Sequence, residues 1–486
     1  MKTLGEILKK LDILYIKGSV DFPISNISFD SRKVENNYVF VAVSGTQTNG
    51  HNFIEAAIKK GAKAIVCEVL PSEMLETVTY LKVKNAAEAL GFMAADFYDN
   101  PSEEITLIGV TGTNGKTTTV TLLYRLFKKL GYKVGLISTI ANYIDDIKND
   151  TTHTTPEPLT LNRLLREMVE AGCEYAFMEV SSHSTVQHRV TGITYAGGVF
   201  TNLTHDHLDF HGTFAEYLKA KKLFFDNLPK NAFALTNIDD RNGEVMLQNT
   251  LAKKYTYALK TPSNFKAKIL EQHFEGTLIE INDNELWVRL IGTFNIYNLT
   301  VVFAVAYLLG VQKEDILLVL SNLTTVSGRF DTVRAKNGVT AIVDYAHTPD
   351  ALENVLTTIN ELKTPDNTII TVVGAGGDRD KTKRPIMAKI AHKFSNKVIL
   401  TSDNPRTEKP EDILNDMKKG LSDSELANII TIQDRKEAIK TAAILAKAND
   451  IILIAGKGHE TYQEVNGVRT HFDDKELITN CFELIM

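Results

Sequence analysis

The chain has 486 residues, more than one hydrophobic core usually serves, so we expect roughly two or three domains. With 43% hydrophobic and 23% charged residues, its composition is typical of a soluble globular protein. The net charge of −6 provides no field that attracts a polyanion, and we expect no nucleic-acid partner.

The N-terminal segment has the pattern of an amphipathic helix start over residues 1–10 rather than that of a signal peptide. No apolar run reaches the about 18 residues that a membrane span requires, so we expect a cytoplasmic protein without membrane insertion. The first hundred residues are irregular, and their clearest strands are "YVFVAVSG" and "AKAIVCE". The scattered cysteines Cys67, Cys173 and Cys481 form no metal-ligand spacing, which favours buried thiols.

A strand–helix–strand alternation begins at "ITLIGV" (105–110), continues through the helix "TTTVTLLYRLFKKLG" and returns to a strand at "KVGLIST". The same alternation fills the last third of the chain, from "GVTAIVDYA" to "DIILIAGKG". Such units predict an α/β fold with parallel sheets and helices on their faces. With linkers at "DNPSEEI" and "TTVSGRFD", we expect domains at 1–100, 101–327 and 328–486.

The strongest motif is "GVTGTNGKTTT", in which a strand ends in a glycine-rich turn that opens a helix. Successive backbone N–H groups then face one point and favour phosphate oxygens. Lys116 would neutralise phosphate charge and the Thr117 hydroxyl could hold Mg²⁺, which predicts ATP or GTP binding. The spacing is imperfect because Val110 replaces a glycine, and a turn without a ligand is the alternative.

Two further clusters follow along the chain. The apolar strand in "AFMEVSSHS" ends at Glu179, where a nucleotide fold would place a Mg²⁺ ligand, although a solvated carboxylate is the alternative. The loop "FTNLTHDHLDFHG" concentrates oxygen and imidazole groups that suit a divalent cation or are polar surface, namely His205, Asp206, His207, Asp209 and His211. The next helix carries Lys219, Lys221 and Lys222, which on sequence alone are a solvated face.

Nine motifs occur in an order that closely resembles the Mur ligases. They are "GVTGTNGKTTT", "MEVSSHS", "TNLTHDHLDFHG", "EYLKAKKLFF", "GTFNIYN", "SGRFD", "VDYAHTPDAL", "GAGGDRDKTKRP" and "DNPRTE". The resemblance covers all three expected domains. It implies an N-terminal α/β domain for the UDP-sugar, a central P-loop ATPase-type parallel sheet, and a C-terminal Rossmann-like domain for the amino acid.

The resemblance is strongest to the members that add the third residue of the peptidoglycan stem peptide. It implies ATP-dependent ligation of meso-diaminopimelate to UDP-N-acetylmuramoyl-L-alanyl-D-glutamate through an acyl phosphate, by an enzyme expected to be a monomer. The implied metal ligands for Mg²⁺ are Thr117, Glu179, His207 and Lys221, the last as a carbamate formed with CO₂. With Lys116, the residues Glu179, His207 and Lys221 are the implied catalytic set.

The resemblance also implies three sets of binding residues. The nucleotide contacts are Gly112, Thr113, Asn114, Gly115, Lys116, Thr117, Thr118, Asn295, Asn298, Arg329 and Asp344. The UDP-sugar contacts are Ser31 in "NISFDSRKV", Thr154, Thr155, Ser181, Gln187 and Arg189. The amino-acid contacts are Arg379, Asp403, Asn404, Pro405, Arg406, Gly456 and Glu460. His153 and Asn49 depart from the usual family residues, which affects fine substrate contacts and not the reaction.

Several of these residues could instead have purely structural roles. Asn295 and Asn298 could cap a helix N-terminus, and "DNPR" could be a turn in which proline fixes φ. As a ligand site, Arg406 would grip the second carboxylate of meso-diaminopimelate with two parallel hydrogen bonds. Two other functions compete with the ligase: a folylpolyglutamate synthetase-like enzyme would not need "NISFDSRKV", and a nucleotide switch would not need Lys221 or "DNPR".

Overall fold

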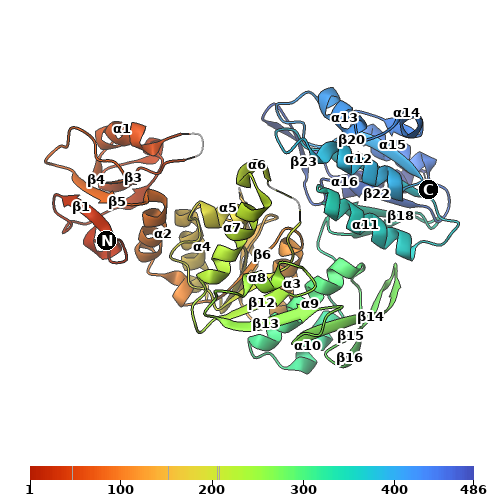
Figure 1. Cartoon of the computed structure of the whole chain (residues 1–486), viewed down its shortest axis with the longest axis horizontal. Coiled ribbons are helices and arrows are strands. Elements are labelled where there is room, and N and C mark those ends of the chain that lie inside the picture. Colours follow the sequence, from red (N-terminus) through yellow and green to blue (C-terminus); the bar gives the residue numbers. More distant parts are fainter. Residues whose placement is uncertain (46–47, 152, 205, 207, 486) are drawn as a thin grey trace.

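The computed structural model describes residues 1–45, 48–151, 153–204, 206 and 208–485. Over these residues the chain forms sheets of five, eleven and six strands and one two-stranded hairpin. Figure 1 shows the N-terminal sheet at one end of the long axis and the six-stranded sheet at the other, with the largest sheet between them. The predicted α/β class is confirmed, while the domain boundaries at 100 and 327 stay predictions.

The N-terminal sheet has the order β1-β5-β4-β3-β2, with only β1 antiparallel to its neighbour among the described strands. Its strands are β1 (Ile13–Lys17), β2 (Asn26–Ser28), β3 (Tyr38–Val41), β4 (Ala62–Cys67) and β5 (Thr79–Val83). Its helices are η1 (Gly5–Ile7), η2 (Ser31–Lys33), η3 (Gly50–Phe53), α1 (Ile54–Lys59), α2 (Ala86–Phe97) and η4 (Pro101–Glu103). One face of the sheet packs against α2 and η1, and the other packs against α1.

The helix expected at residues 1–10 is wrong. This segment forms a β-bridge between Thr3 and Pro23 and then the single turn η1. Leu4 and Ile7 are fully buried in the core beneath α2, so the apolar residues that suggested a longer helix instead anchor a single 3-10 turn. Tertiary packing thus overrides a weak local propensity for a longer helix.

The central sheet has the order β16-β15-β14-β13-β12-β11-β6-β10-β7-β8-β9. Its parallel part comprises β6 (Thr106–Thr111), β7 (Val134–Ile137), β10 (Tyr175–Glu179), β11 (Gly197–Phe200), β12 (Phe233–Asn237), β13 (Lys253–Ala258) and β14 (Phe265–His273). Antiparallel strands extend both edges, namely β8 (Asn142–Ile144), β9 (Ile147–Asn149), β15 (Gly276–Ile281) and β16 (Asn284–Val288). Strands β6 and β10 are almost entirely buried, as expected for parallel strands covered on both faces.

Helices cover both faces of this sheet. They are α3 (Lys116–Lys129), α4 (Pro158–Glu170), α5 (Ser182–Val186), α6 (Leu208–His211), α7 (Phe214–Asp226), α8 (Gly243–Met246), α9 (Thr293–Leu308) and α10 (Lys313–Leu320). The helices α3, α9 and α10 form one core with the sheet, and α4 and α7 form the other. Helix α9 is apolar around most of its circumference, which suits its burial between α3 and α10.

The C-terminal sheet has the order β17-β18-β22-β19-β20-β21, in which β17 is antiparallel to β18. Its strands are β17 (Asp331–Arg334), β18 (Thr340–Asp344), β19 (Ile369–Ala375), β20 (Lys397–Ser402), β21 (Ile429–Thr431) and β22 (Ile451–Ala455), and β23 (Tyr462–Val465) pairs with β24 (Val468–His471). Its helices are α11 (Pro349–Leu362), α12 (Lys383–Phe394), α13 (Pro410–Lys418), α14 (Asp423–Leu426), α15 (Arg435–Leu445) and α16 (Asp474–Ile485). Helices α11, α12 and α13 cover one face, and α15 and α16 cover the other.

Helix starts in these domains follow local capping chemistry. Pro349 opens α11 behind Thr348, whose hydroxyl accepts the Ala351 N–H, and Thr213 caps α7 in the same way. Cys67, Cys173 and Cys481 are free and buried, which confirms the expectation for them. Within the described chain, no helix combines the length and the apolar composition needed to cross a lipid bilayer.

A buried ion pair joins the first residues of α15 and α16 in the C-terminal domain. Arg435 and Asp474 are both fully buried, with Nη2 2.7 Å from Oδ2. The same guanidinium donates to the carbonyls of Ala455 and Ser402, at 3.0 and 3.4 Å. It therefore fixes the carboxyl ends of β22 and β20 relative to each other.

We predict that Arg435→Met destabilises this domain by ~3–5 kcal/mol, because Asp474 would keep a buried charge without its partner. Unfolding in guanidinium chloride measures the change in the free energy of unfolding. Hydrogen exchange of the β20 and β22 amides identifies the unfolding transition that belongs to this domain. Arg469→Met is the control: Arg469 is 62% exposed in its pair with Glu464, so its loss should cost less than ~1 kcal/mol. Equal stabilities of the two variants would contradict the role given to Arg435.

Candidate active site

The P-loop lies where β6 passes into α3, at the carboxyl edge of the central parallel sheet. Its backbone is held by β11 and the following residues: Thr113 N donates to Asn202 O at 2.8 Å, and Asn114 N donates to Asn202 Oδ1 at 2.9 Å. Gly115 has φ of 85°, and a Cβ there would meet Asn298 Oδ1 at 2.5 Å. The loop is thus a built cradle that opens a helix N-terminus, the arrangement that binds phosphate.

Two lysines meet at the carbonyl oxygen of Gly112. Lys116 Nζ donates to it at 2.9 Å and also to Thr113 O at 2.8 Å. Lys221 Nζ, from α7, donates to the same Gly112 oxygen at 2.7 Å. Burial lowers the pKa of both lysines, and the Lys116 charge lowers the pKa of Lys221 further, to well below its ordinary value. The site therefore favours a neutral amine at Lys221.

The sequence predicted a solvated face for the three lysines of α7, but the structure places them in three different environments. Lys219 is 78% exposed and faces Glu216 at 3.8 Å. Lys222 pairs with Asp226 at 2.6 Å along the helix. Lys221 is only 2% exposed and lies against the P-loop. The solvated-face reading is therefore wrong for Lys221.

Glu179 is 1% exposed at the carboxyl end of β10, so it is not a solvated carboxylate. Its Oε1 accepts hydrogen bonds from Thr139 N at 2.8 Å and from Thr139 Oγ1 at 3.1 Å. Its charge raises the pKa of Lys116, which places the carboxylate near the P-loop lysine. With the Thr117 hydroxyl at the start of α3, this supplies the oxygen ligands that Mg²⁺ prefers.

The histidine-rich loop contributes less to the described site than the P-loop, Lys221 and Glu179 do. His205 and His207 lie outside the described residues, so the expectation that His207 binds metal stays a prediction. His211 Nε2 lies 2.9 Å from Ser182 Oγ, which ties the loop to α5. Among the described residues, no three His, Cys, Asp or Glu side chains come close enough to hold a metal ion by themselves.

Asn295 and Asn298 do not cap α9. Gly292 holds the N-cap position, and Asn295 Nδ2 donates backward to Ile291 O at 2.8 Å. Asn298 is 5% exposed, and its Oδ1 accepts from Thr119 Oγ1 at 3.3 Å. Because Asn298 also lines the approach to Gly115, both asparagines lie beside the P-loop.

Arg329 and Asp344 meet where the central and C-terminal domains join. Arg329 Nη2 donates to Thr117 Oγ1 at 3.4 Å, and its guanidinium lies 4.5 Å from the Tyr345 ring centre. Asp344 Oδ2 accepts the Phe330 N–H at 2.6 Å. Burial raises the pKa of Asp344 to about 6, against the lowering effect of Arg329. This junction brings the C-terminal domain to the phosphate-binding loop.

A second contact reaches the P-loop from the C-terminal domain. Asp350, in the first turn of α11, accepts a hydrogen bond from Asn114 Nδ2 at 2.9 Å. Burial raises the pKa of Asp350, partly offset by its hydrogen bonds to Thr204 and Asn114. Asp350 carries no sequence signal for this role, because "HTPDAL" has only the pattern of a helix start.

Most of the residues expected to bind the UDP-sugar lie close together near the carboxyl end of β10. Thr155 Oγ1 donates to Glu179 O at 2.8 Å and accepts the Ser181 N–H at 3.2 Å. Arg189 Nη1 donates to Thr155 O at 2.9 Å, and Thr154 Oγ1 accepts from Thr139 Oγ1 at 3.0 Å. Gln187 ends α5 as its C-cap residue. The cluster is connected through Thr155 to the strand that carries Glu179.

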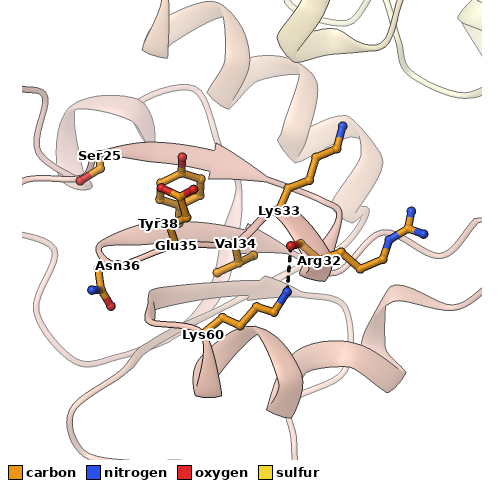
Figure 2. A pocket seen from close by; sticks show the side chains of 8 residues that line it. All are labelled: Ser25, Arg32, Lys33, Val34, Glu35, Asn36, Tyr38 and Lys60. Carbon is orange, nitrogen blue, oxygen red and sulfur yellow. Dashed lines mark hydrogen bonds between the residues drawn. The ribbon is translucent and has the colours of Figure 1, made fainter.

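Ser31 stands apart from this cluster, in η2 of the N-terminal domain. Its neighbours line an open hollow of about 650 Å³, shown in Figure 2. Arg32, Lys33 and Lys60 give the hollow a basic character, and Lys60 Nζ donates to Arg32 O at 2.8 Å. Within the described chain, no hydrogen bond joins Ser31 to Thr154, Thr155 or Arg189. A substrate contacting both sets would have to span the two domains.

The amino-acid residues converge after β20 and β22. Asn404 Nδ2 donates to Glu460 Oε2 at 2.7 Å, and Asp403 O accepts from Gln463 Nε2 at 2.8 Å. A Cβ on Gly456, which has φ of 118°, would meet Asp403 Oδ2 at 2.8 Å. Strands β20 and β22 flank β19, and the carboxyl ends of parallel strands are where open α/β sheets bind ligands. The structure therefore brings Asp403, Asn404, Gly456 and Glu460 together.

Arg406 is half-buried with φ of 54°, and its Nη1 donates to Gly377 O at 2.6 Å. Its backbone pairs with Val465 beside β23. Pro405 is buried, and a Cβ on Gly377 would meet its carbonyl oxygen at 1.8 Å. Arg379 is exposed, and Nη1 reaches Asp378 O at 3.4 Å. "DNPR" is thus a turn and also one wall of the polar cluster.

Two buried cations in this region were missed by sequence reasoning. Arg384 is fully buried and pairs with Glu408 at 2.8 Å and Asp416 at 2.9 Å, which pins "DNPRTE" to α12. Lys457 is fully buried between Asp403 and Glu460. Lys457 stands between two predicted site residues in "AGKGHE", a position that could have identified it.

Three family models match the chain. The "Mur ligase family, catalytic domain" matches residues 23–98, the "Mur ligase middle domain" matches 110–306, and the "Mur ligase, glutamate ligase domain" matches 328–458. A curated relative from Bacteroides fragilis, named UDP-N-acetylmuramoyl-L-alanyl-D-glutamate--2,6-diaminopimelate ligase, is 57% identical over 481 residues and 99% of each chain. A relative of the same name from Cytophaga hutchinsonii is 54% identical over 99% of each chain.

Solved structures agree with these matches. A structure of a UDP-N-acetylmuramoyl-L-alanyl-D-glutamate--2,6-diaminopimelate ligase has a TM-score of 0.70 and 33% identity, covering 99% of both chains. A folylpolyglutamate synthase from Thermotoga maritima, at 17% identity and a TM-score of 0.57, covers 76% of this chain and 90% of its own, a likeness of fold alone. The full-length identity to curated relatives decides between the two, and the chain belongs to the Mur ligase family.

Proposed function

We propose that this protein is an ATP-dependent ligase that adds meso-diaminopimelate to UDP-N-acetylmuramoyl-L-alanyl-D-glutamate in peptidoglycan precursor synthesis. The observation that carries the proposal is the shared carbonyl of Gly112, where the P-loop lysine and the buried Lys221 meet. A nucleotide switch needs the first lysine and not the second. The names of relatives that are 57% identical along the whole chain supply the substrates.

The reaction begins because a carboxylate is a poor acyl donor. The γ-phosphoryl group of ATP passes to the γ-carboxylate of the D-glutamate residue and leaves ADP. The free amine of the amino acid then attacks the acyl phosphate, and the tetrahedral intermediate expels inorganic phosphate to leave an amide. The chain must therefore hold the polyphosphate, the carboxylate and the amine close together and correctly oriented. Such proximity accounts for much of the rate of a ligation reaction.

The nucleotide would lie on the P-loop, with Gly112, Thr113, Asn114, Gly115, Lys116, Thr117 and Thr118 around its phosphates. Lys116 carries a positive charge beside the cradle of backbone N–H groups, which stabilises negative charge on the transferred phosphoryl group. Asn295 and Asn298 would contact the adenine, since a primary amide matches its donor and acceptor edge. Arg329 and Asp344 would complete the nucleotide contacts from the domain junction.

The oxygen ligands at this point fit Mg²⁺, which would be held by Thr117, Glu179, His207 and a carbamate on Lys221. The metal would screen the negative charge of the phosphates. Carbamate formation joins the neutral Lys221 amine to CO₂ with loss of one proton. The burial of Lys221 and the nearby Lys116 charge both favour that neutral amine. The modification turns a buried cation into an anionic ligand and removes the repulsion between the two lysines.

The two remaining substrates would bind on either side. The muramoyl dipeptide would contact Thr154, Thr155, Ser181, Gln187 and Arg189, with its uridine end at Ser31. The diaminopimelate would lie against Arg379, Asp403, Asn404, Pro405, Arg406, Gly456 and Glu460. We further propose a monomeric enzyme in the cytoplasm, where these substrates are made available.

Phosphate release from ATP tests the reaction directly. It should require both the UDP-muramoyl dipeptide and meso-diaminopimelate, and the product should gain the mass of one diaminopimelate residue less water. Turnover of ATP without the dipeptide would contradict the ligase, and release with L-glutamate plus a folate in place of both substrates would favour the folylpolyglutamate class.

We predict that Lys116→Ala lowers kcat for ligation by at least ~10²-fold, the scale of one lost transition-state contact. Alanine keeps the first turn of α3 helical, so the protein should fold. Circular dichroism and steady-state phosphate release measure both points. Near-native turnover in the folded variant would contradict the phosphate-binding role of this lysine.

We predict that Lys221→Ala is nearly inactive and regains part of its activity with added acetate, which can replace a lost carboxylate ligand. The matched control is Lys219→Ala on the same helix, since Lys219 is exposed and should be dispensable. Mass spectrometry under CO₂ tests for the carbamate independently of turnover. Full activity of Lys221→Ala at ordinary Mg²⁺ concentrations would remove Lys221 from the metal site.

We predict a preference for meso-diaminopimelate over L-lysine of roughly 10⁴ in kcat/KM, because lysine would leave the Arg406 guanidinium unpaired. Arg406→Ala should lose most of this preference, and Arg406→Lys should recover little, since an ammonium cannot form the two parallel bonds of a guanidinium. Arg469→Ala, an exposed arginine on β24, is the control and should keep the preference. Efficient use of L-lysine by the unmodified protein would show that "DNPR" is only a turn.

A further inference from the structure

Lys457 is a lysine with no exposed side-chain surface, placed directly after Gly456 at the end of β22. Burial of an ammonium group is costly unless acceptors replace its water. Here Nζ donates to Asn404 Oδ1 at 2.9 Å and lies 3.3 Å from Glu460 Oε2 and 3.6 Å from Asp403 Oδ1. All three acceptors belong to the polar cluster after β20 and β22.

The first consequence concerns the side-chain amide of Asn404. Its Oδ1 accepts two hydrogen bonds, one from Lys457 Nζ and one from Glu464 N at 2.9 Å. Because an ammonium and a backbone N–H can only donate, this end of the amide must be the oxygen. The Nδ2 group is then turned to Glu460 Oε2 at 2.7 Å. Lys457 and the Glu464 N–H thus set the orientation of Asn404 together.

The second consequence concerns Glu460. Its Oε2 takes both the Asn404 Nδ2 donor and the Lys457 ammonium. In the described part of the chain, no protein donor is bound to Oε1. A carboxylate held at one oxygen has a defined direction for the other, which is what recognition of a ligand ammonium group requires.

The third consequence is charge balance. Asp403 and Glu460 are two carboxylates in a largely buried cluster, and burial together with the Asp403 charge raises the pKa of Glu460. Lys457 and Asn404 oppose that rise. Other charged or titratable groups also face the pair, namely Arg435, Lys383, Tyr345 and Tyr462.

Those other groups cannot replace the ammonium of Lys457. Arg435 is already engaged with Asp474 through two hydrogen bonds. Burial lowers the pKa of Lys383, and the two tyrosines are neutral at physiological pH because burial raises their pKa. Lys457 is therefore the cation in direct contact with the carboxylates of this cluster.

We propose that Lys457 is a positioning residue for the amino-acid substrate: it orients Asn404 and balances Asp403 and Glu460, so that Glu460 Oε1 receives an ammonium group of a diamino acid. The proposal rests on the proposed function, since it concerns the same pocket. In this arrangement the Glu460 carboxylate, which Lys457 keeps ionised, binds an ammonium group of the substrate. Arg406, on the other side of the pocket, would bind a carboxylate of the substrate.

Lys457→Met tests it, because methionine fills similar volume without charge or donor. We expect KM for meso-diaminopimelate to rise by at least ~10-fold at pH 7, the scale of one lost hydrogen bond to a charged group. The KM values for ATP and the UDP-muramoyl dipeptide should stay within about twofold, since neither the P-loop nor Thr155 contacts Lys457.

The pH profile separates positioning from mere support of the fold. Lys457 lowers the pKa of Glu460, so its loss should raise that pKa, and a protonated Glu460 no longer attracts an ammonium. The ratio of KM for diaminopimelate in Lys457→Met to that in the unmodified protein should therefore rise as pH falls from 8.5 to 6.5. Using the ratio cancels the titration of the substrate itself. A pH-independent ratio would overturn the proposal.

Further variants keep the test decisive. Lys457→Gln retains an N–H donor for folding but no charge, and should show the same pH-dependent rise in KM. Lys440→Met, which removes an exposed lysine paired with Glu437 on α15, controls for net charge and should leave every KM unchanged. A folded Lys457→Gln with an unchanged KM for diaminopimelate would overturn the proposal.

Failure of the proposed function is distinct from all of these outcomes. In that case the unmodified protein would release no phosphate that depends on diaminopimelate.

Discussion

The carbonyl oxygen of Gly112 accepts hydrogen bonds from two lysine amines, and the electrostatic cost of charging both of them governs the central site. One lysine opens α3 from the same loop, while the other crosses from α7 on the opposite face of the sheet. Two cations so close in a buried place repel each other, as the lowered pKa of Lys221 records. The site is stable with an anion between the lysines or with one lysine neutral. Both conditions suit a loop that handles phosphate.

The amino-acid pocket concentrates charge of the opposite sign. There carboxylates are crowded after β20 and β22, and a buried ammonium lies among them. The framework around the pocket is fixed by arginines that serve no ligand: Arg435 clamps the two strand ends and Arg384 pins the loop after Arg406. Buried ion pairs of this kind are rarely a net gain in stability, but they define geometry, because each partner is costly to leave alone.

The sequence was sufficient where chemistry is local. The P-loop, the strand that ends at Glu179 and the turn at "DNPR" are all contiguous, so their motifs predicted both the elements and their place at the sheet edge. Sequence could not separate Lys221 from Lys219 and Lys222, because the face of α7 that is buried depends on packing against β6 and the P-loop. The same limit explains the error at residues 1–10 and the wrong capping alternative for Asn295 and Asn298. Lys457 lies three residues before Glu460, but its other partners, Asn404 and Asp403, are 53 or more residues away, so the sequence did not show that it is buried among them.

The opposite charges of the two pockets also explain why the overall net charge is a poor guide to this protein. A chain of net charge −6 would repel a polyphosphate at long range. Within the site, Lys116, Arg329 and the N-terminus of α3 face the phosphate position at short range, where burial reduces screening by salt. The carboxylates of Asp403 and Glu460 lie on the other domain, where an ammonium must be attracted. Diaminopimelate itself carries two ammonium and two carboxylate groups and no net charge, so its pocket needs both signs, with carboxylates at Asp403 and Glu460 and a guanidinium at Arg406. The P-loop, in contrast, presents positive charge to phosphate.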